Sequence, residues 1–220
     1  MTSSGLDGKK AVCMAVHRTL LLNPLLGLQN RLGKHCTKVM SIPWEDDMLE
    51  NESSSLFTWK PSDSIFVTLL KHSPNSTAVF LHDSDMHYQA SAACSLGPAC
   101  PTGTVLLGQV LLDHSPEDLS YRIMVLLFDA LQIGDQDFVA LRMMPQERYA
   151  RMRQLCDNSQ GVILSPTTMM VQWAGKYDLV KEFSMGFHSE QNLPNHVAEG
   201  IIAYGQDHPC KLCILDRRPG

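Results

Sequence analysis

The chain has 220 residues, of which 44% are hydrophobic and 19% charged, which suits one domain or a domain with a small appendage. A net charge of −5 and a pI of about 6.0 exclude a global positive field for nucleic acid, so any RNA contact must be local. No apolar stretch approaches the roughly 18 residues of a membrane span. The first ten residues lack a secretory signal pattern. We therefore expect an intracellular protein with no membrane partner.

The seven cysteines, an odd number, favour free thiols in a reducing compartment over a disulfide framework. Cys210 and Cys213 form one CxxC pair. A structural zinc site needs four ligands, so two thiols on a strand or turn is the simpler interpretation, with zinc or redox chemistry as the alternative.

The N-terminal part reads as helical. Residues 11–33 carry apolar residues at mixed three- and four-residue spacing with Pro24 breaking the run, which predicts a helix, a turn and a short second helix. The polar, acidic residues 41–55 predict a loop with at most one helical turn. We expect residues 1–37 to form a helical segment and residues 38–220 to form the main domain.

From residue 56 the pattern changes to short β-type segments separated by turn signals such as Lys60-Pro61 and Ser73-Pro74-Asn75. Their spacing predicts antiparallel sheet. The expected strands cover residues 56–59, 64–70, 77–82, 86–90, 104–113 and 121–133.

One clear helix is expected after these strands. Residues 144–157 place Pro145 near the first turn, with Arg148, Arg151 and Arg153 on the polar side. Such arginines form either a solvated face or a phosphate site. A strand with an adjoining short helix follows over 168–180, and 196–205 predicts a strand, a turn and a second strand. The outline is α+β and rich in strands.

The order of these segments resembles the nucleotidyltransferase domain of mRNA capping guanylyltransferases, a fold shared with ATP-dependent DNA and RNA ligases. The resemblance covers roughly residues 38–220. It implies an α+β, ATP-grasp-like ligase or capping-enzyme domain built on antiparallel sheets with flanking helices. The chain ends at residue 220, so we expect no oligonucleotide-binding-fold domain after it.

The first motif of the resemblance is Trp59-Lys60, which begins the family's Lys-x-Asp-Gly signature. The resemblance makes Lys60 the nucleophile that attacks the α-phosphate of GTP, with Trp59 at the nucleotide. A surface lysine is the alternative. The Asp-Gly pair is replaced by Ser62-Asp63, and the ribose-binding arginine by Ile65. The change to Ile65 removes a charge and up to five donors.

Two further motifs lie in the middle of the chain. Leu107-Gly108-Gln109 resembles a hairpin whose glutamate helps to bind ribose and metal, but Gln109 carries no negative charge for magnesium and can still hydrogen-bond a sugar. The segment around Phe128-Asp129 resembles the strand that carries a base-stacking aromatic residue. Phe128 is either that platform or a core residue.

The last two motifs concern metal and phosphate. Glu199-Gly200 resembles an acid-glycine pair whose acid coordinates metal at the triphosphate, and a turn glutamate is the alternative. Asp216 stands where the family has the first of two phosphate-binding lysines. Arg218 stands near the second and retains a cation for phosphate.

Three functions remain open. The preferred one is a catalytically inactive guanylyltransferase-like domain that binds a guanine nucleotide, an RNA cap or a protein partner in cap metabolism. The second is an active guanylyltransferase that forms a lysine–GMP intermediate with Mg²⁺ or Mn²⁺. The third is a protein-interaction module. Capping or methyltransferase proteins are candidate partners, and a capping role implies the nucleus rather than the cytoplasm.

Overall fold

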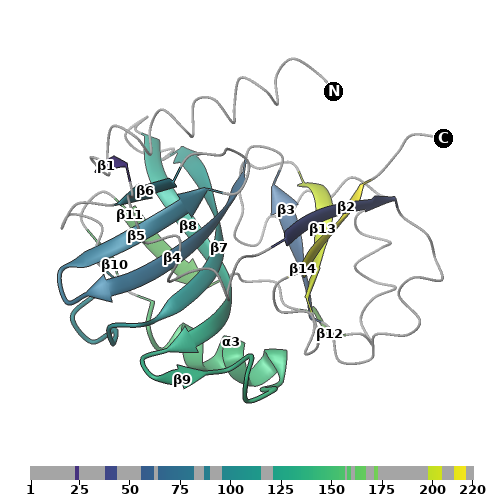
Figure 1. Cartoon of the computed structure of the whole chain (residues 1–220). Helices are drawn as coiled ribbons and strands as arrows, with labels where there is room; N and C mark the ends of the chain where they lie inside the picture. The colour runs from purple at the N-terminus through teal and green to yellow at the C-terminus, as the bar shows by residue number, and fades with distance from the viewer. Residues whose placement is uncertain are drawn as a thin grey trace.

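A computed structural model describes two β-sheets and one helix (Figure 1). The described residues are 23–24, 38–43, 56–61, 64–81, 87–89, 96–114, 121–156, 158–159, 162–166, 171–172, 198–204 and 211–216. Side chains are described at 58, 60–61, 64–80, 96–112, 123–156 and 202.

The larger sheet has nine strands in the order β1-β6-β5-β4-β7-β8-β11-β10, with β9 paired to β8. Its strands are β1 Asn23–Pro24, β4 Ile65–Ser73, β5 Ser76–Leu81, β6 His87–Gln89, β7 Val105–His114, β8 Tyr121–Ile133, β9 Gln136–Asp137, β10 Asn158–Ser159 and β11 Val162–Pro166. Most pairs are antiparallel, whereas β11 pairs with β8 in parallel.

The smaller sheet has five strands in the order β12-β3-β13-β14-β2. They are β2 Lys38–Pro43, β3 Leu56–Pro61, β12 Val171–Gln172, β13 Ala198–Tyr204 and β14 Lys211–Asp216. Strand β3 therefore belongs to one sheet and β4, which follows it in the chain, to the other. The turn between them joins the two sheets.

Both faces of the larger sheet are buried. Ile65, Val67 and Leu69 of β4 belong to one hydrophobic cluster, and the alternating Phe66 and Leu70 belong to the second. Alternation of this kind follows from the two-residue period of a strand. The second cluster includes Ile202 of β13, so this face of the larger sheet packs against the smaller sheet.

The helix α3, Pro145–Arg153, packs on β8. Pro145 stands at the start of the helix, where a missing N–H costs nothing. Met152 is buried in the first cluster together with Phe138. Arg148 is also fully buried, so the expectation that it lies on the polar side with Arg151 and Arg153 is wrong. Its guanidinium points inward because it forms an ion pair with the buried carboxylate of Asp129.

The structure confirms strands in all six expected segments between 56 and 133, and the helix that begins at Pro145. Residues 198–204 form one continuous strand, so the expected turn within 196–205 is wrong. Residues 41–43 lie in β2, where a loop was expected. Both segments pair with neighbouring strands of the smaller sheet. Local sequence patterns do not report such pairing, and here it overrides a weak local preference.

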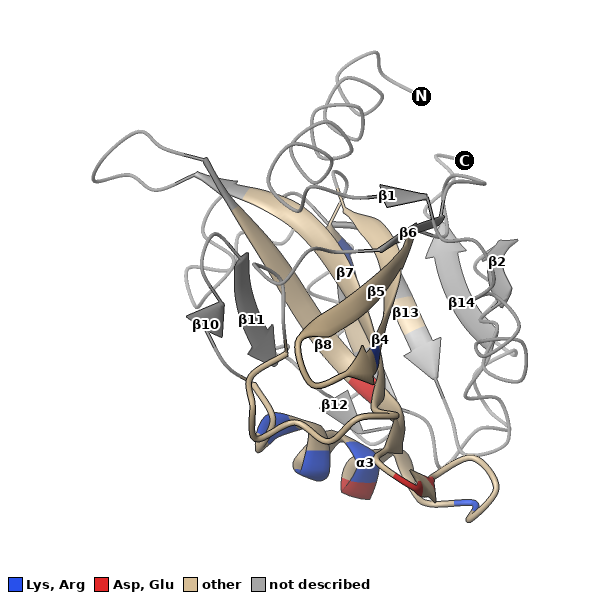
Figure 2. Ribbon diagram, turned by 60° about the vertical axis from the view of Figure 1, so that its left-hand side comes forward, with Lys and Arg blue, Asp and Glu red and all other residues tan. Residues whose placement is uncertain are grey.

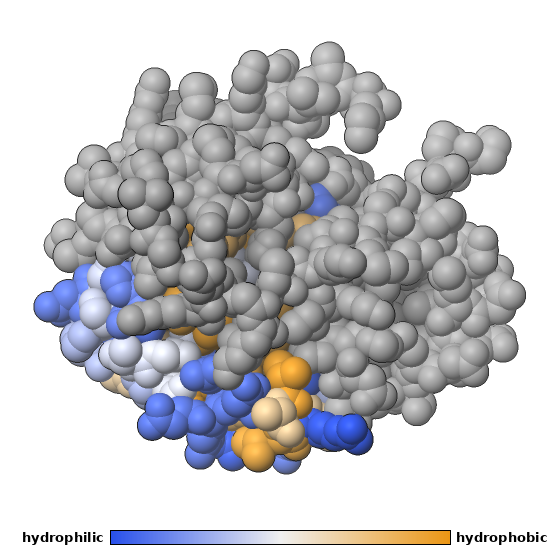
Figure 3. Space-filling model, in the orientation of Figure 1, coloured by the Kyte–Doolittle hydropathy of each residue, from blue (hydrophilic) through white to orange (hydrophobic). Residues whose placement is uncertain are grey.

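The expected N-terminal helices fall outside the described residues except at β1, and the short helix after β12 is outside them as well. No helix in the described part of the chain is long and apolar enough to cross a membrane. In Figure 2, α3 carries both basic and acidic residues. Figure 3 shows a mostly hydrophilic surface with a small apolar patch in the described part that this view exposes.

Candidate functional site

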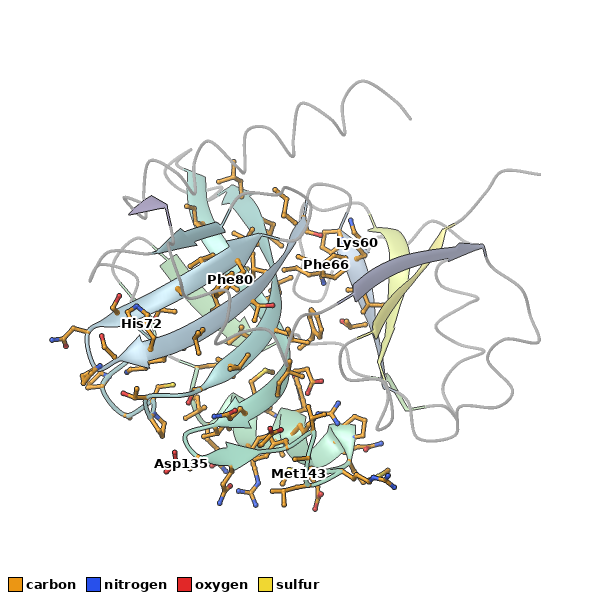
Figure 4. All side chains as sticks on the ribbon, viewed as in Figure 1. Lys60, Phe66, His72, Phe80, Asp135 and Met143 are labelled. Carbon is orange, nitrogen blue, oxygen red and sulfur yellow. The ribbon has the colours of Figure 1, made fainter. Side chains whose placement is uncertain are left out.

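Lys60 stands near the end of β3 and is 2% exposed. Its Nζ lies over the ring of Phe66 in β4, 5.7 Å from the ring centroid. A cation over an aromatic face is attracted by the ring quadrupole, more so where water is excluded. In Figure 4 both side chains lie where the smaller sheet faces the larger one. The two sheets therefore hold this ammonium in a largely dry position.

Lys60 shares one row of the smaller sheet with two residues from other motifs. Lys60 pairs with Gly200 of β13, and Gly200 pairs with Asp216 of β14. Pairing across neighbouring strands spans about 4.8 Å per strand. A register shift between Ala198 and Gly200 leaves Glu199 at the irregularity beside this row. Three segments that are far apart in sequence thus meet at one level.

The turn that follows Lys60 is closed by Ser64. The Ser64 amide donates to the carbonyl oxygen of Pro61 at 3.1 Å. The Ser64 Oγ lies 2.7 Å from that same carbonyl oxygen and 2.8 Å from Oε1 of Gln109. Gln109 is 1% exposed and pairs with Phe66 across β7 and β4. Gln109 and Phe66 therefore lie on one face, and Lys60 lies over Phe66.

Phe128 lies in the second hydrophobic cluster and is 1% exposed. Its ring meets Phe66 edge to face, with centroids 6.3 Å apart. Leu107 of β7 and Ile202 of β13 belong to the same cluster. Phe128 is thus part of the packing beneath Lys60, and its use as a base platform stays a prediction.

Asp129 forms a buried ion pair with Arg148. Nε and Nη2 of Arg148 donate to the two carboxylate oxygens, each at 2.8 Å, and the Ala130 amide donates to Oδ1 at 2.8 Å. Burial raises the pKa of the Asp129 carboxyl, while Arg148 and the Ala130 amide act in the opposite direction. This carboxylate ties α3 to β8.

The other expected site residues are only partly described. Trp59 and Glu199 lie in β3 and β13, but their side chains are outside the described residues, as is all of Arg218. Cys213 lies in β14, and Cys210 is outside.

Among the described residues no group of three or more His, Cys, Asp or Glu could hold a metal ion. Beside Phe66, the ring under Lys60, lie a hydroxyl and a carboxamide oxygen, from Ser64 and Gln109. Both are neutral, whereas Mg²⁺ is usually bound through one or two carboxylates. These two side chains do not fit a magnesium site by themselves.

Sequence reasoning gave no role to Ser64 or Phe66, and it placed Arg148 on the polar side of its helix. The alternating pattern of β4 already places Ser64 and Phe66 on one face. What the sequence lacks is the pairing of β4 with β7, which brings Gln109 beside them. An arginine three residues into a helix gives no sign of burial until its partner on β8 is known.

No protein-family model matches the chain, and no curated protein matches it either. Solved structures that are similar to it include two ligases. One is a mycobacterial DNA ligase D complexed with ATP and MES, with a TM-score of 0.47 and 10% identity over 84% of this chain and 61% of that one. The other is the ligase domain from M. tuberculosis LigD, with a TM-score of 0.43 and 9% identity over 86% of this chain and 58% of that one. The chain thus spans about three fifths of the ligase chains.

Proposed function

We propose that this chain is a nucleotidyltransferase-like domain that binds a guanine nucleotide, free or as an RNA cap, without transferring it. The observation that carries the proposal is the placement of Lys60. It is buried between two sheets, with its ammonium over Phe66, in one row with Gly200 and Asp216. The first, fourth and last motifs of the resemblance meet there, as a shared nucleotide site requires.

The changed motif residues favour binding over catalysis. Ile65, at the position of the ribose-binding arginine, packs in the first hydrophobic cluster, on the opposite face of β4 from Phe66. Gln109, at the position of the metal-binding glutamate, is neutral and lies at hydrogen-bond distance from Ser64. Transfer of a nucleotidyl group needs charge stabilisation at the phosphate, and these two positions supply none.

Active transfer is the second candidate because the nucleophile itself is retained. Lys60 lies largely away from water, a setting in which a lysine can serve as a nucleophile. Attack of its amine on the α-phosphate of GTP would form a lysine–GMP bond and release pyrophosphate. The Lys60 proton would have to pass to solvent or a neighbouring base.

One experiment separates the two candidates. The protein is incubated with α-labelled GTP and Mg²⁺ or Mn²⁺, denatured and tested for label, while thermal unfolding is followed with GTP, ATP and a methylated cap dinucleotide. We expect no label and a raised midpoint with a guanine ligand, since a ligand at 100 times its Kd stabilises by about 2.7 kcal/mol. Label that is lost in Lys60→Met would establish transfer. No shift with any ligand would refute the binding proposal.

A further inference from the structure

The hydroxyl of Ser64 has two neighbours but one proton. Its Oγ lies 2.7 Å from the Pro61 carbonyl oxygen and 2.8 Å from Oε1 of Gln109. A hydroxyl carries one proton, which the two acceptor oxygens, of Pro61 and Gln109, therefore share. Ser64 thus bridges the carbonyl that follows Lys60 and the carboxamide of Gln109, and this pair of contacts is called the Ser64 bridge below.

Gln109 is the far end of this bridge. Its Oε1 accepts from the Ser64 hydroxyl, and both side chains are buried, at 1% and 0% exposure. Gln109 therefore links the turn after Lys60 to β7 by a contact that water does not replace.

We infer that Ser64 and Gln109 are positioning residues for Lys60, which deepens the proposed function and rests on it for the role of Lys60. The Ser64 bridge begins at the carbonyl of Pro61, the residue that follows Lys60, and ends at Gln109 on β7, which pairs with Phe66 of β4. The bridge thus fixes the end of β3 beside the strand pair that carries the ring beneath the ammonium. Breaking the bridge frees the end of β3 and lets the lysine leave Phe66.

The test measures the acetylation rate of Lys60 by an N-hydroxysuccinimide acetate, mapped by peptide mass spectrometry, in the intact chain without nucleotide. Lys71 is the internal reference. It is 1% exposed, and its Nζ donates to the carbonyls of Leu96 and Gly97, both at 2.7 Å. Acetylation at Lys71 therefore reports general opening of the larger sheet, and the ratio of the two rates reports the local state of Lys60.

Two variants break the Ser64 bridge at different points: Ser64→Ala removes the donating hydroxyl, and Gln109→Met removes the accepting oxygen at similar side-chain length. Thr68→Val is the matched control, since it removes another fully buried hydroxyl from β4. We expect both bridge variants to raise the Lys60 to Lys71 ratio about fivefold or more, the effect of one lost buried hydrogen bond, and the control to leave it within about twofold.

A ratio that stays unchanged in both bridge variants would overturn the inference, as would an equal rise in the Thr68→Val control. If one bridge variant fails to fold, the other decides. The readout needs no nucleotide, so its failure is separable from failure of the proposed function. If the variants raise the Lys60 ratio but the protein binds no guanine ligand, only the proposed function is contradicted. If the protein binds a guanine ligand but the variants leave the ratio unchanged, only this inference is contradicted.

Discussion

Arg148 and Asp129 form a two-pronged ion pair inside the protein, with both N–O distances at 2.8 Å and both side chains at 0 to 1% exposure. The third donor contact of the guanidinium, from Nη1, is the Met143 carbonyl at 2.8 Å. One arginine thus joins α3, the segment before it, and β8. Its packing explains why a helix with several basic residues does not present all of them to solvent.

We expect Arg148→Met to lower the free energy of unfolding by about 3–5 kcal/mol, because an unpaired charge would remain buried at Asp129. The double variant Arg148→Met with Asp129→Leu should recover part of the loss. Urea unfolding measures both, with exposed Arg142→Met as the control. A single variant within 1 kcal/mol of the unchanged protein would contradict the role of the pair.

The loss in Arg148→Met should also depend on pH. Burial already raises the pKa of Asp129 above 3.8, and removal of Arg148 removes the largest opposing cause. A carboxyl whose pKa is raised by folding takes up a proton first in the folded state, so the variant gains stability as pH falls from neutrality toward 3.8. Urea unfolding at pH 5 and pH 8 should show a smaller loss of unfolding free energy in Arg148→Met at pH 5 than at pH 8. The reverse order would be evidence against an unpaired carboxylate at Asp129.

Gly108 lies where β7 and β8 come very close. A Cβ there would stand 2.9 Å from the Leu126 carbonyl oxygen and 3.1 Å from side-chain atoms of Val125 and Leu127. We expect Gly108→Ala to cost about 1–3 kcal/mol, as overpacking does. Thermal unfolding measures this, with exposed Asp135→Ala in the β8–β9 turn as the control. A neutral result would mean that the two strands can separate at no cost.

Lys71 secures the segment before β7. Its Nζ donates to two carbonyls of that segment, and its backbone amide donates to Thr104 at 2.9 Å. Lys71→Met would leave the carbonyls of Leu96 and Gly97 without this donor, a loss of about 1–3 kcal/mol. We expect faster proteolytic cleavage within residues 96–104. Cleavage at the rate of the unchanged protein would rule out this anchoring role.

The thiol of Cys156 should react slowly with alkylating agents at neutral pH. Burial raises its pKa from 9.0 to about 11, with Arg153 acting in the opposite direction. Since only the thiolate is nucleophilic, alkylation of Cys156 in the folded protein should still increase between pH 9 and 11, well above the range of an exposed cysteine. The raised pKa leaves stability unchanged below pH 9 and lowers it above, where the unfolded thiol ionises first. Rapid alkylation at pH 7 would contradict this.

The sequence predicts the local elements well where their patterns are strong. The alternation in residues 64–70, the long apolar run of β8 and the Pro145 start of α3 all agree with the structure. The sequence fails where a distant partner decides. The parallel pairs β11–β8 and β14–β2, the single strand over 198–204 and the burial of Arg148 all depend on contacts between separate segments.

Prediction of the candidate site from the sequence has the same limit, because contacts between distant segments form the site. Ordered motifs point to Lys60 and Gly200, and the smaller sheet pairs them directly. The resemblance gives Gln109 a ligand role, whereas the structure pairs its Oε1 with the hydroxyl of Ser64, which no motif marks. Phe66, the ring under the ammonium, reads as one apolar residue among several in β4. Only the pairing of strands and the turn between the sheets reveals its place.

Guanine binding at the Lys60 site is the central claim, and isothermal titration of the intact chain with GTP, a methylated cap dinucleotide and ATP tests it most directly. We expect measurable heat of binding for a guanine ligand and a lower affinity for ATP. The Lys60→Met variant should bind the guanine ligand more weakly. The variant Arg142→Met, at an exposed site, should bind as the unchanged chain does. Absence of binding to either guanine ligand, or identical binding by Lys60→Met, would contradict the account.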